Sequence, residues 1–229
     1  GDVTTNVESS SKSGVGMALA KLAQRTTPDT VADTLREAIL DGSLKAGSQL
    51  REIHVAAELG ISRAPLREAL RRLEEEGLIV KIPFKGAFVA EVGREAIDDI
   101  SRLRSVLKPW AIEQALPHLT GARLTELRRQ INNLASAAKA HNVQKSIDAH
   151  LAFHRVIYEA SGNGELAGIW RGWESQLRLF LAADLRQYED PMTVANSHSA
   201  MLVLIENGDL EALKLEMKHH IHGVDALGD

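Results

Sequence analysis

Apolar residues recur every three or four positions along most of this chain, and short polar breaks separate the periodic segments. The segment "TPDTVADTLREAILDG" places Val31, Leu35 and Ile39 on one face. It opens with Pro28, a residue suited to a first helical turn, and closes with a glycine. This pattern predicts a helix, and the "SLKAGSQL" that follows predicts a turn.

Two further helices and a hairpin are predicted next. The segment "REIHVAAELG" predicts a short helix with Ile53, Ala56 and Ala57 facing inward. In "ISRAPLREALRRLEEEG", Ser62 occupies the N-cap position of a helix with leucines along one side. The β-prone runs "LIVKI" and "AFVAEV" then flank "PFKG", which predicts a β-hairpin. Three helices followed by a hairpin, within residues 28–92, predict a winged helix-turn-helix domain.

From residue 93 to residue 229 the apolar period is helical throughout, without a second pair of β-prone runs. Six helices are predicted, at roughly 94–116, 121–140, 144–161, 164–187, 192–206 and 209–225. The fold class is therefore mainly α, with a winged helix-turn-helix followed by an all-α helical bundle. Residues 1–27 are polar and are expected to form a flexible N-terminal tail.

The composition narrows the classes of function. The chain has 229 residues, no cysteine and a net charge of −4, so disulfides and thiolate metal sites are excluded. No apolar run approaches the roughly 20 residues of a membrane helix, so we expect a cytoplasmic protein without a membrane partner. Against this acidic total, residues 62–72 hold four arginines and one acid, the only dense basic stretch in the sequence.

This basic stretch falls on the second helix of the helix-turn-helix, the element that enters the DNA major groove in such domains. Arg63 and Arg67 are four residues apart and share a face, which Arg71 continues. An arginine fork matches the O6 and N7 acceptors of guanine, while the Ser62 hydroxyl and the free amides at the helix start suit a phosphate. The alternative for any single arginine is a solvated helix face.

The segment from residue 29 to residue 91, and "SRAPLREALRRLEEEGL" above all, resembles the DNA-binding domain of the GntR family of bacterial transcription regulators. The resemblance implies that Arg63 and Arg67 contact bases and phosphates. Lys85 and Gly86 are expected at the tip of the hairpin, the wing of this fold. There the lysine would meet a phosphate or the minor groove, and the glycine would permit close backbone approach.

Histidines recur in the predicted bundle in a pattern that suits a metal site. His150 and His154 are four residues apart, so both rings lie on one face of their helix. His198 and His220 lie on consecutive helices at similar distances from the turn "NGD", so an antiparallel pair brings them to about the same level. Four imidazoles can thus converge inside the bundle, where helical proteins commonly bind metals. The alternative is a set of core or surface histidines without a ligand.

The segments "HLAFHRVIYEASGN" and "NSHSAMLVLIENGDLEALKLEMKHHI" resemble the FCD ligand-sensing domain of the FadR branch, and six helices match its shorter, VanR-like members. That family's D-x-x-F-H pattern supplies two metal ligands, and each of its last two helices supplies a histidine. The resemblance implies His154, His198 and His220 as ligands. His150 stands where the family has aspartate. Asp148 lies roughly 120° away around the helix, so His150 is the better candidate for the fourth ligand.

An imidazole in place of the carboxylate makes the site richer in nitrogen, which favours a divalent transition metal such as zinc or nickel. It also leaves less neutralising charge, so an anion is attracted to an open coordination position. The alternative is that the metal is lost and the histidines bind an anion directly. Arg104 matches the arginine of the family's R-x-x-[apolar]-E motif and is the expected contact for a carboxylate effector. Lys108 replaces the acid of that motif, so a surface salt bridge is the alternative for Arg104.

Together these features predict a transcription regulator and not an enzyme. It would be a homodimer that binds a palindromic double-stranded DNA operator and responds to a small carboxylate by changing the relative placement of its DNA-reading domains. A metal hydrolase or oxygenase would need an acid or base at helical spacing near the histidines, which the sequence does not offer. An architectural DNA-binding protein would have a broader basic surface and no converging histidines.

Overall fold

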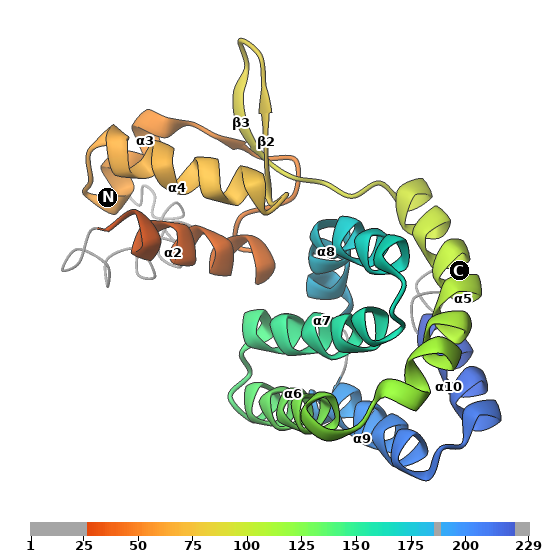
Figure 1. The fold of residues 1–229 in the computed structure, drawn as a ribbon. Coiled ribbons are helices and arrows are strands. Elements are labelled where there is room, and N and C mark those ends of the chain that lie inside the picture. Colours follow the sequence, from red (N-terminus) through yellow and green to blue (C-terminus); the bar gives the residue numbers. More distant parts are fainter. Residues whose placement is uncertain (1–26, 186–188, 223–229) are drawn as a thin grey trace, which may run out of the picture. The chain divides into compact units, whose positions relative to one another are not determined.

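The computed structural model describes residues 27–185 and 189–222, with the side chains of the last four excepted (Figure 1). The chain divides into two compact units, one up to Ala90 and one from Glu91 onward. Each unit has its own buried apolar core. The tail predicted at residues 1–27 and the end of the last predicted helix fall almost entirely outside the described residues.

The N-terminal unit contains three helices and a small antiparallel sheet. These elements are α2 (Pro28–Leu40), β1 (Gln49–Leu50), α3 (Glu52–Leu59), α4 (Arg63–Glu75), β2 (Ile79–Ile82) and β3 (Gly86–Val89). The strand order is β1-β3-β2, and the β2–β3 hairpin extends away from α4 (Figure 1). Thr27 caps α2 by accepting a hydrogen bond from the Thr30 amide, and α4 buries Leu66, Leu70 and Leu73. The winged helix-turn-helix predicted from the sequence is confirmed.

Two details of this unit differ from the sequence prediction. The segment "SLKAGSQL" does not end as a turn, because Gln49 and Leu50 pair with Phe88 and Ala87 as the third strand of the sheet. A two-residue strand is too short to show the alternation by which strands are detected in a sequence. In α3, Ile53 is 66% exposed and Ala57 is exposed, so their predicted inward orientation is wrong. Only the second turn of α3 is buried, through Ala56 and Leu59.

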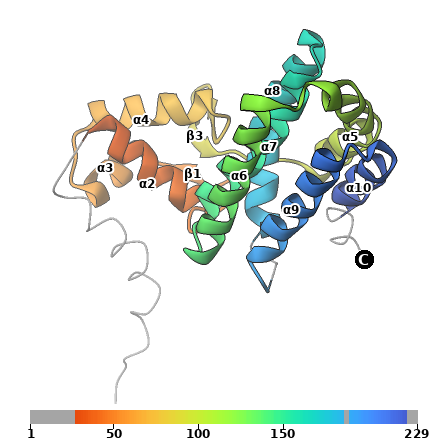
Figure 2. The ribbon, with the colours of Figure 1, turned by 60° about the horizontal axis from the view of Figure 1, so that its bottom comes forward.

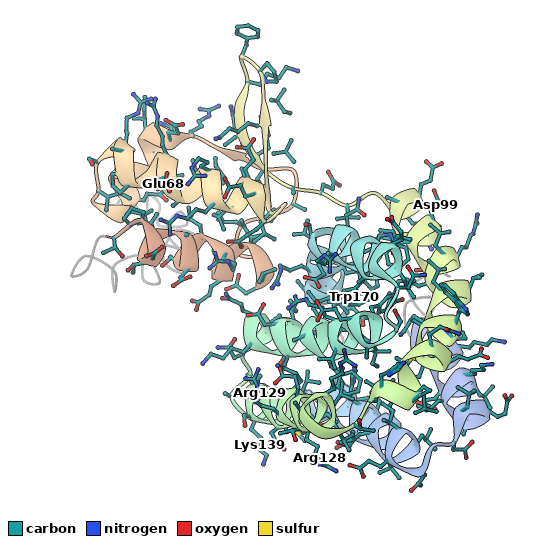
Figure 3. All side chains as sticks on the ribbon, in the orientation of Figure 1. Glu68, Asp99, Arg128, Arg129, Lys139 and Trp170 are labelled. Atoms are coloured by element: carbon teal, nitrogen blue, oxygen red, sulfur yellow. The ribbon has the colours of Figure 1, made fainter. Side chains whose placement is uncertain are left out.

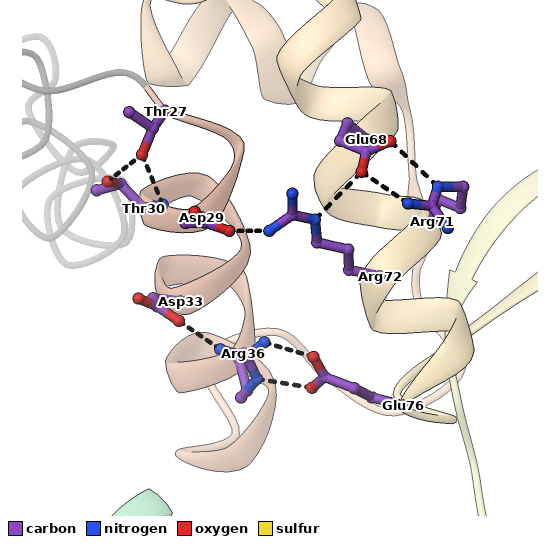
Figure 4. Close-up of polar contacts among 9 residues, drawn as sticks. All are labelled: Thr27, Asp29, Thr30, Asp33, Arg36, Glu68, Arg71, Arg72 and Glu76. Carbon is purple, nitrogen blue, oxygen red and sulfur yellow. Dashed lines mark hydrogen bonds and ion pairs between the residues drawn. The ribbon is translucent and has the colours of Figure 1, made fainter.

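Ion pairs connect α2 to α4 (Figure 4). The Arg36 guanidinium donates from Nε and Nη2 to the two carboxylate oxygens of Glu76, at 2.7 and 2.5 Å. Its Nη1 donates to Asp33 at 2.5 Å, and the hydrogen bond to Glu76 is the main cause that raises the pKa of Arg36. The Arg36 side chain is only 14% exposed, so this two-point pair is better shielded from water than an ordinary surface pair.

We therefore expect Glu76→Gln to lower the free energy of unfolding of the N-terminal unit by about 1 kcal/mol, because Arg36 would keep its charge and lose its main acceptor. Differential scanning calorimetry of the full chain measures the effect. Glu75→Gln is the matched control, since Glu75 is more exposed and, among the described residues, pairs with Arg71 alone, on its own helix. Equal, negligible changes for both variants would contradict a structural role for the pair.

The C-terminal unit is a bundle of helices, and its helix order is the one predicted from the sequence. Its elements are α5 (Arg94–Ala115), η1 (Leu116–His118), α6 (Gly121–Lys139), α7 (Val143–Ala160), α8 (Gly164–Leu185), α9 (Met192–Asn207) and α10 (Leu210–His222). Helix α7 packs between α6 and α8, α9 packs on α6, and α10 packs on α5 (Figures 1 and 2). The core is mostly aliphatic, with Phe153 and Met201 among its buried members.

Most charged side chains of this bundle lie on its surface. Trp170 on α8 is fully buried inside it, whereas Arg128, Arg129 and Lys139 lie on the outer side of α6 (Figure 3). Three histidines and two basic residues are exceptions, because they are also buried: His150, His154, His198, Arg104 and Lys108. Burial of cationic groups is costly unless something neutralises them, which makes this interior the candidate site.

Candidate functional site

Three histidines meet inside the bundle. His150 and His154 lie one turn apart on α7, and His198 reaches them from α9. One ring nitrogen from each lies within 4.8 Å of the others, and the Nε2 atoms of His154 and His198 are 3.2 Å apart. The helical spacing of the pair on α7 thus does place both rings toward the same partner helix.

The hydrogen bonding and burial of these histidines favour the state that binds metals. His198 Nδ1 lies 2.7 Å from the Val194 carbonyl oxygen, to which it can only donate, so its Nε2 lone pair faces His154. Burial lowers the pKa of His198 to about 4 and holds the pKa of His154 well below its usual value. Both imidazoles are therefore neutral at pH 7, as a metal ligand must be.

The donor set fits a tetrahedral transition metal. Two imidazole nitrogens bound to zinc at their usual distance of about 2.0–2.1 Å would be about 3.3 Å apart, close to the observed Nε2–Nε2 separation. Asp148 does not join them, because it forms an ion pair with Arg178. The remaining predicted ligand, His220, belongs to α10, but its side chain lies outside the described residues.

Four buried donor groups adjoin the histidines without a hydrogen-bond partner in the described structure. They are Arg104 Nε, Lys108 Nζ, Tyr158 Oη–H and Trp170 Nε1–H. Arg104 and Lys108, on successive turns of α5, are 4% and 2% exposed. The surface salt bridge considered for Arg104 is thus excluded by its burial.

Ring contacts and charge interactions place these donors in one region. His154 and Trp170 have ring centroids 5.7 Å apart, and Tyr158 stacks on Trp170 at 4.8 Å. Burial lowers the pKa of Lys108, and the nearby Arg104 charge lowers it further. The Lys108 charge in turn contributes to the low pKa of His154. Tyr158 and Trp170 were not predicted to lie at this site, although His150, His154 and Tyr158 recur at four-residue spacing on α7.

On the N-terminal unit, the predicted DNA-contacting arginines lie at the start of α4. Ser62 is the N-cap, and no cap hydrogen bond from its side chain is found. Arg63 and Arg67 have side chains 53% and 60% exposed, and both donate to Oε2 of Glu52 on α3, at 3.1 and 2.9 Å. Exposed ion pairs of this kind contribute only about 0–1 kcal/mol, so both guanidinium groups can exchange this carboxylate for a nucleic acid.

The next two arginines of α4 differ in their surroundings. Arg71 is exposed and pairs with Glu68 and Glu75 on its own helix. Arg72 also pairs with Glu68, but its Nη1 reaches across to Asp29 on α2 (Figure 4). The exposed face of α4 is therefore the one that carries Arg63, Arg67 and Arg71.

The hairpin tip differs in detail from the prediction. Gly86 is the first residue of β3 and pairs with Ile82, and its φ of 98° is one that favours glycine. Lys85 lies in the turn, where its carbonyl oxygen accepts a 2.6 Å hydrogen bond from the Gln49 side chain. The fully exposed residue of this turn is Phe84, with a φ of 64°, which the sequence analysis did not single out.

Comparisons with known proteins bear on both units. A family described as bacterial regulatory proteins of the gntR family matches residues 27–89, and the FCD domain family matches residues 99–223. Both matches agree with the resemblances noted in the sequence. None of the described helices is long and apolar enough to span a membrane.

Several individual relatives align with most of the chain. An HTH-type transcriptional regulator from an unstable DNA locus of Streptomyces ambofaciens is 26% identical over 90% of this chain and 86% of its own length. The gluconate operon transcriptional repressor of Bacillus subtilis is 25% identical, over 86% and 83%. Among solved structures, E. coli McbR/YncC superposes with a TM-score of 0.62 at 25% identity, covering 87% of this chain and 95% of McbR. These relatives are transcription regulators, in agreement with the expectation that the chain is not an enzyme.

Proposed function

The chain belongs to the GntR family of bacterial regulatory proteins and carries an FCD domain, and from this premise we propose that a small organic acid controls its affinity for DNA. That the chain is a DNA-binding transcription regulator follows from its family membership. We infer further that the acid binds in the C-terminal bundle, at a transition metal held by His150, His154 and His198, with His220 as the further predicted ligand. Zinc and nickel are the metals best suited to this nitrogen-rich set.

The geometry of the histidines is the observation that carries this proposal. Three buried ring nitrogens lie within 4.8 Å of one another, with two of them at the separation that a tetrahedral ion requires. When bound, the ion supplies a Lewis-acid position for a carboxylate oxygen. The buried Arg104 guanidinium supplies a second anchor for the same group. One relative is named as the repressor of a gluconate operon, and gluconate is a carboxylate, which supports a carboxylate effector.

Helix α5 links the proposed effector site to the DNA-binding unit along the chain. It begins at Arg94, four residues after the N-terminal unit ends at Ala90, and it carries Arg104 on its buried side. An acid that binds one placement of the DNA-reading unit more tightly than another shifts the population toward that placement. The change in operator affinity equals the difference between the two binding free energies of the acid.

We propose that the regulator acts as a cytoplasmic homodimer on a palindromic operator, because two copies of α4 related by a two-fold axis match two half-sites. Helix α5 supports the dimer by an exposed apolar stripe of Leu103, Val106 and Trp110, spaced by three and four residues. In this arrangement Ser62, Arg63, Arg67 and Arg71 face the major groove, with Lys85 and Gly86 at the wing.

The metal part of the proposal is tested on protein purified without an affinity tag. We expect about one zinc or nickel per chain by mass spectrometry, and His154→Ala to weaken metal binding by at least about 100-fold, because the site loses one of its imidazole ligands. His118→Ala is the control, since His118 is exposed and stands apart from the cluster. Less than a tenth of an equivalent in the wild type, with none taken up on titration, would exclude a metal site.

The effector part is tested by fluorescence anisotropy with labelled operator DNA, adding small carboxylates to metal-loaded and chelator-treated protein. We expect at least one acid to change the operator affinity of the loaded protein, and the chelator to diminish the effect. An unchanged operator affinity with every acid, in the presence of bound metal, would contradict metal-linked sensing.

A further inference from the structure

Lys108 is the residue of the bundle that metal binding and a single carboxylate leave unexplained. It lies on α5 one turn after Arg104, and both are almost completely buried. Neither Arg104 Nε nor Lys108 Nζ has a hydrogen-bond partner in the described structure. Removing a basic group from water without an acceptor costs several kcal/mol, so a native protein retains such a pair only for a reason.

None of the described side chains neutralises these two groups. Among the described residues, the charges that shift the pKa of Arg104, Lys108 and His154 come from one another, from two further histidines and from Tyr158. No carboxylate takes part. The region is therefore cationic or neutral throughout, and a metal ion on the histidines would add to its positive charge.

The unpartnered groups also share a hydrogen-bonding character. Arg104 and Trp170 can only donate, Lys108 donates when protonated, and the Tyr158 hydroxyl donates or accepts. Buried donors in native proteins nearly always have an acceptor. The molecule that completes this site must accordingly be rich in acceptor oxygens and carry negative charge.

We propose that Lys108 determines the charge of the effector: one anionic group binds Arg104, and a second binds Lys108. This inference rests on the proposed effector site and names its ligand class, a short acid with two anionic groups. Residues one helical turn apart have Cβ atoms about 5–6 Å apart, so two carboxylates joined by two or three carbons can reach both. A monocarboxylate of the same length would leave the lysine without an anionic partner.

The test compares matched acids by isothermal titration calorimetry on the full chain. The probes are succinate and glutarate against their monomethyl esters, which have one anionic group fewer and nearly the same shape. We expect the wild type to bind a diacid at least tenfold more tightly than its ester. Lys108→Met should bring this ratio close to one without weakening the ester, and Lys108→Arg should retain the preference.

If Lys108 instead had a structural role, Lys108→Met would unfold at a lower temperature than the wild type; a role in effector binding predicts otherwise. Methionine fills a similar volume and removes a buried basic group, so Lys108→Met should unfold at the same or a higher temperature than the wild type. Equal binding of diacid and ester by the wild type, with a ratio unchanged in Lys108→Met, overturns this inference and leaves the effector site standing. Failure of the wild type to bind any of the four acids overturns the inference together with the proposed carboxylate effector.

Discussion

Replacing Arg67 by alanine should lower the affinity of the protein for its operator by about 5- to 150-fold, the equivalent of one two-point contact between arginine and guanine. The Arg67 side chain is 60% exposed, and among the described residues Glu52 is its one ion-pair partner. That carboxylate gains its low pKa chiefly from the hydrogen bond with Arg67, and the pair is weak because water surrounds it. A guanine edge in the major groove offers the same guanidinium two acceptors in one plane.

The matched control is Arg72→Ala, which removes the same charge from the same helix. Arg72 turns toward α2 and pairs with Asp29, so it is directed away from the proposed DNA-binding face. Titrations of labelled operator and of unrelated DNA, at two salt concentrations, separate a sequence-specific loss from a general loss of charge. Equal losses for both variants, or full operator affinity in Arg67→Ala, would count against α4 as the recognition helix.

The fold was largely predictable because its helices are long and strongly periodic. The leucines of α4 and the breaks between the bundle helices are local signals, and the structure follows them closely. The two-residue strand β1 was missed because its partner, β3, lies far along the chain. Pairing at that distance leaves no local pattern. The exposure of Ile53 has a similar cause, since burial depends on which turns of α3 meet another helix.

The candidate site was predictable only in part. Four-residue spacing places His150 and His154 on one face of α7, and the family pattern pairs them with His198 on another helix. Nothing in the spacing shows that Lys108 turns inward, because lysine on a helix is ordinarily solvated. Its apolar neighbours and the four-residue step from Arg104 are the only local signals. Burial of two adjacent basic residues is a property of the packed bundle, and it appears only with the tertiary structure.

The buried histidines make the metal-free protein sensitive to acid. His198 has a pKa lowered from 6.5 to about 4, chiefly by burial, so the unfolded chain binds its proton at a higher pH than the folded chain does. Stability is therefore unaffected by this group above pH 6.5 and falls as the pH drops from 6.5 to about 4. The shift corresponds to about 3 kcal/mol of lost unfolding free energy for His198 alone, and the lowered pKa of His154 acts in the same direction.

Urea denaturation between pH 4 and 7.5, in the presence of a chelator, measures this loss. Between pH 7.5 and pH 4, we expect the free energy of unfolding of His198→Gln to fall by about 3 kcal/mol less than that of the wild type, because glutamine cannot take up the proton. His118→Gln, at an exposed position, should leave it unchanged. Metal-loaded protein should start more stable at pH 7.5 and lose more on acidification, since protons compete with the ion for the same ring nitrogens. If the free energy of unfolding had the same pH dependence in the wild type and in His198→Gln, the burial of His198 in the histidine cluster would be contradicted.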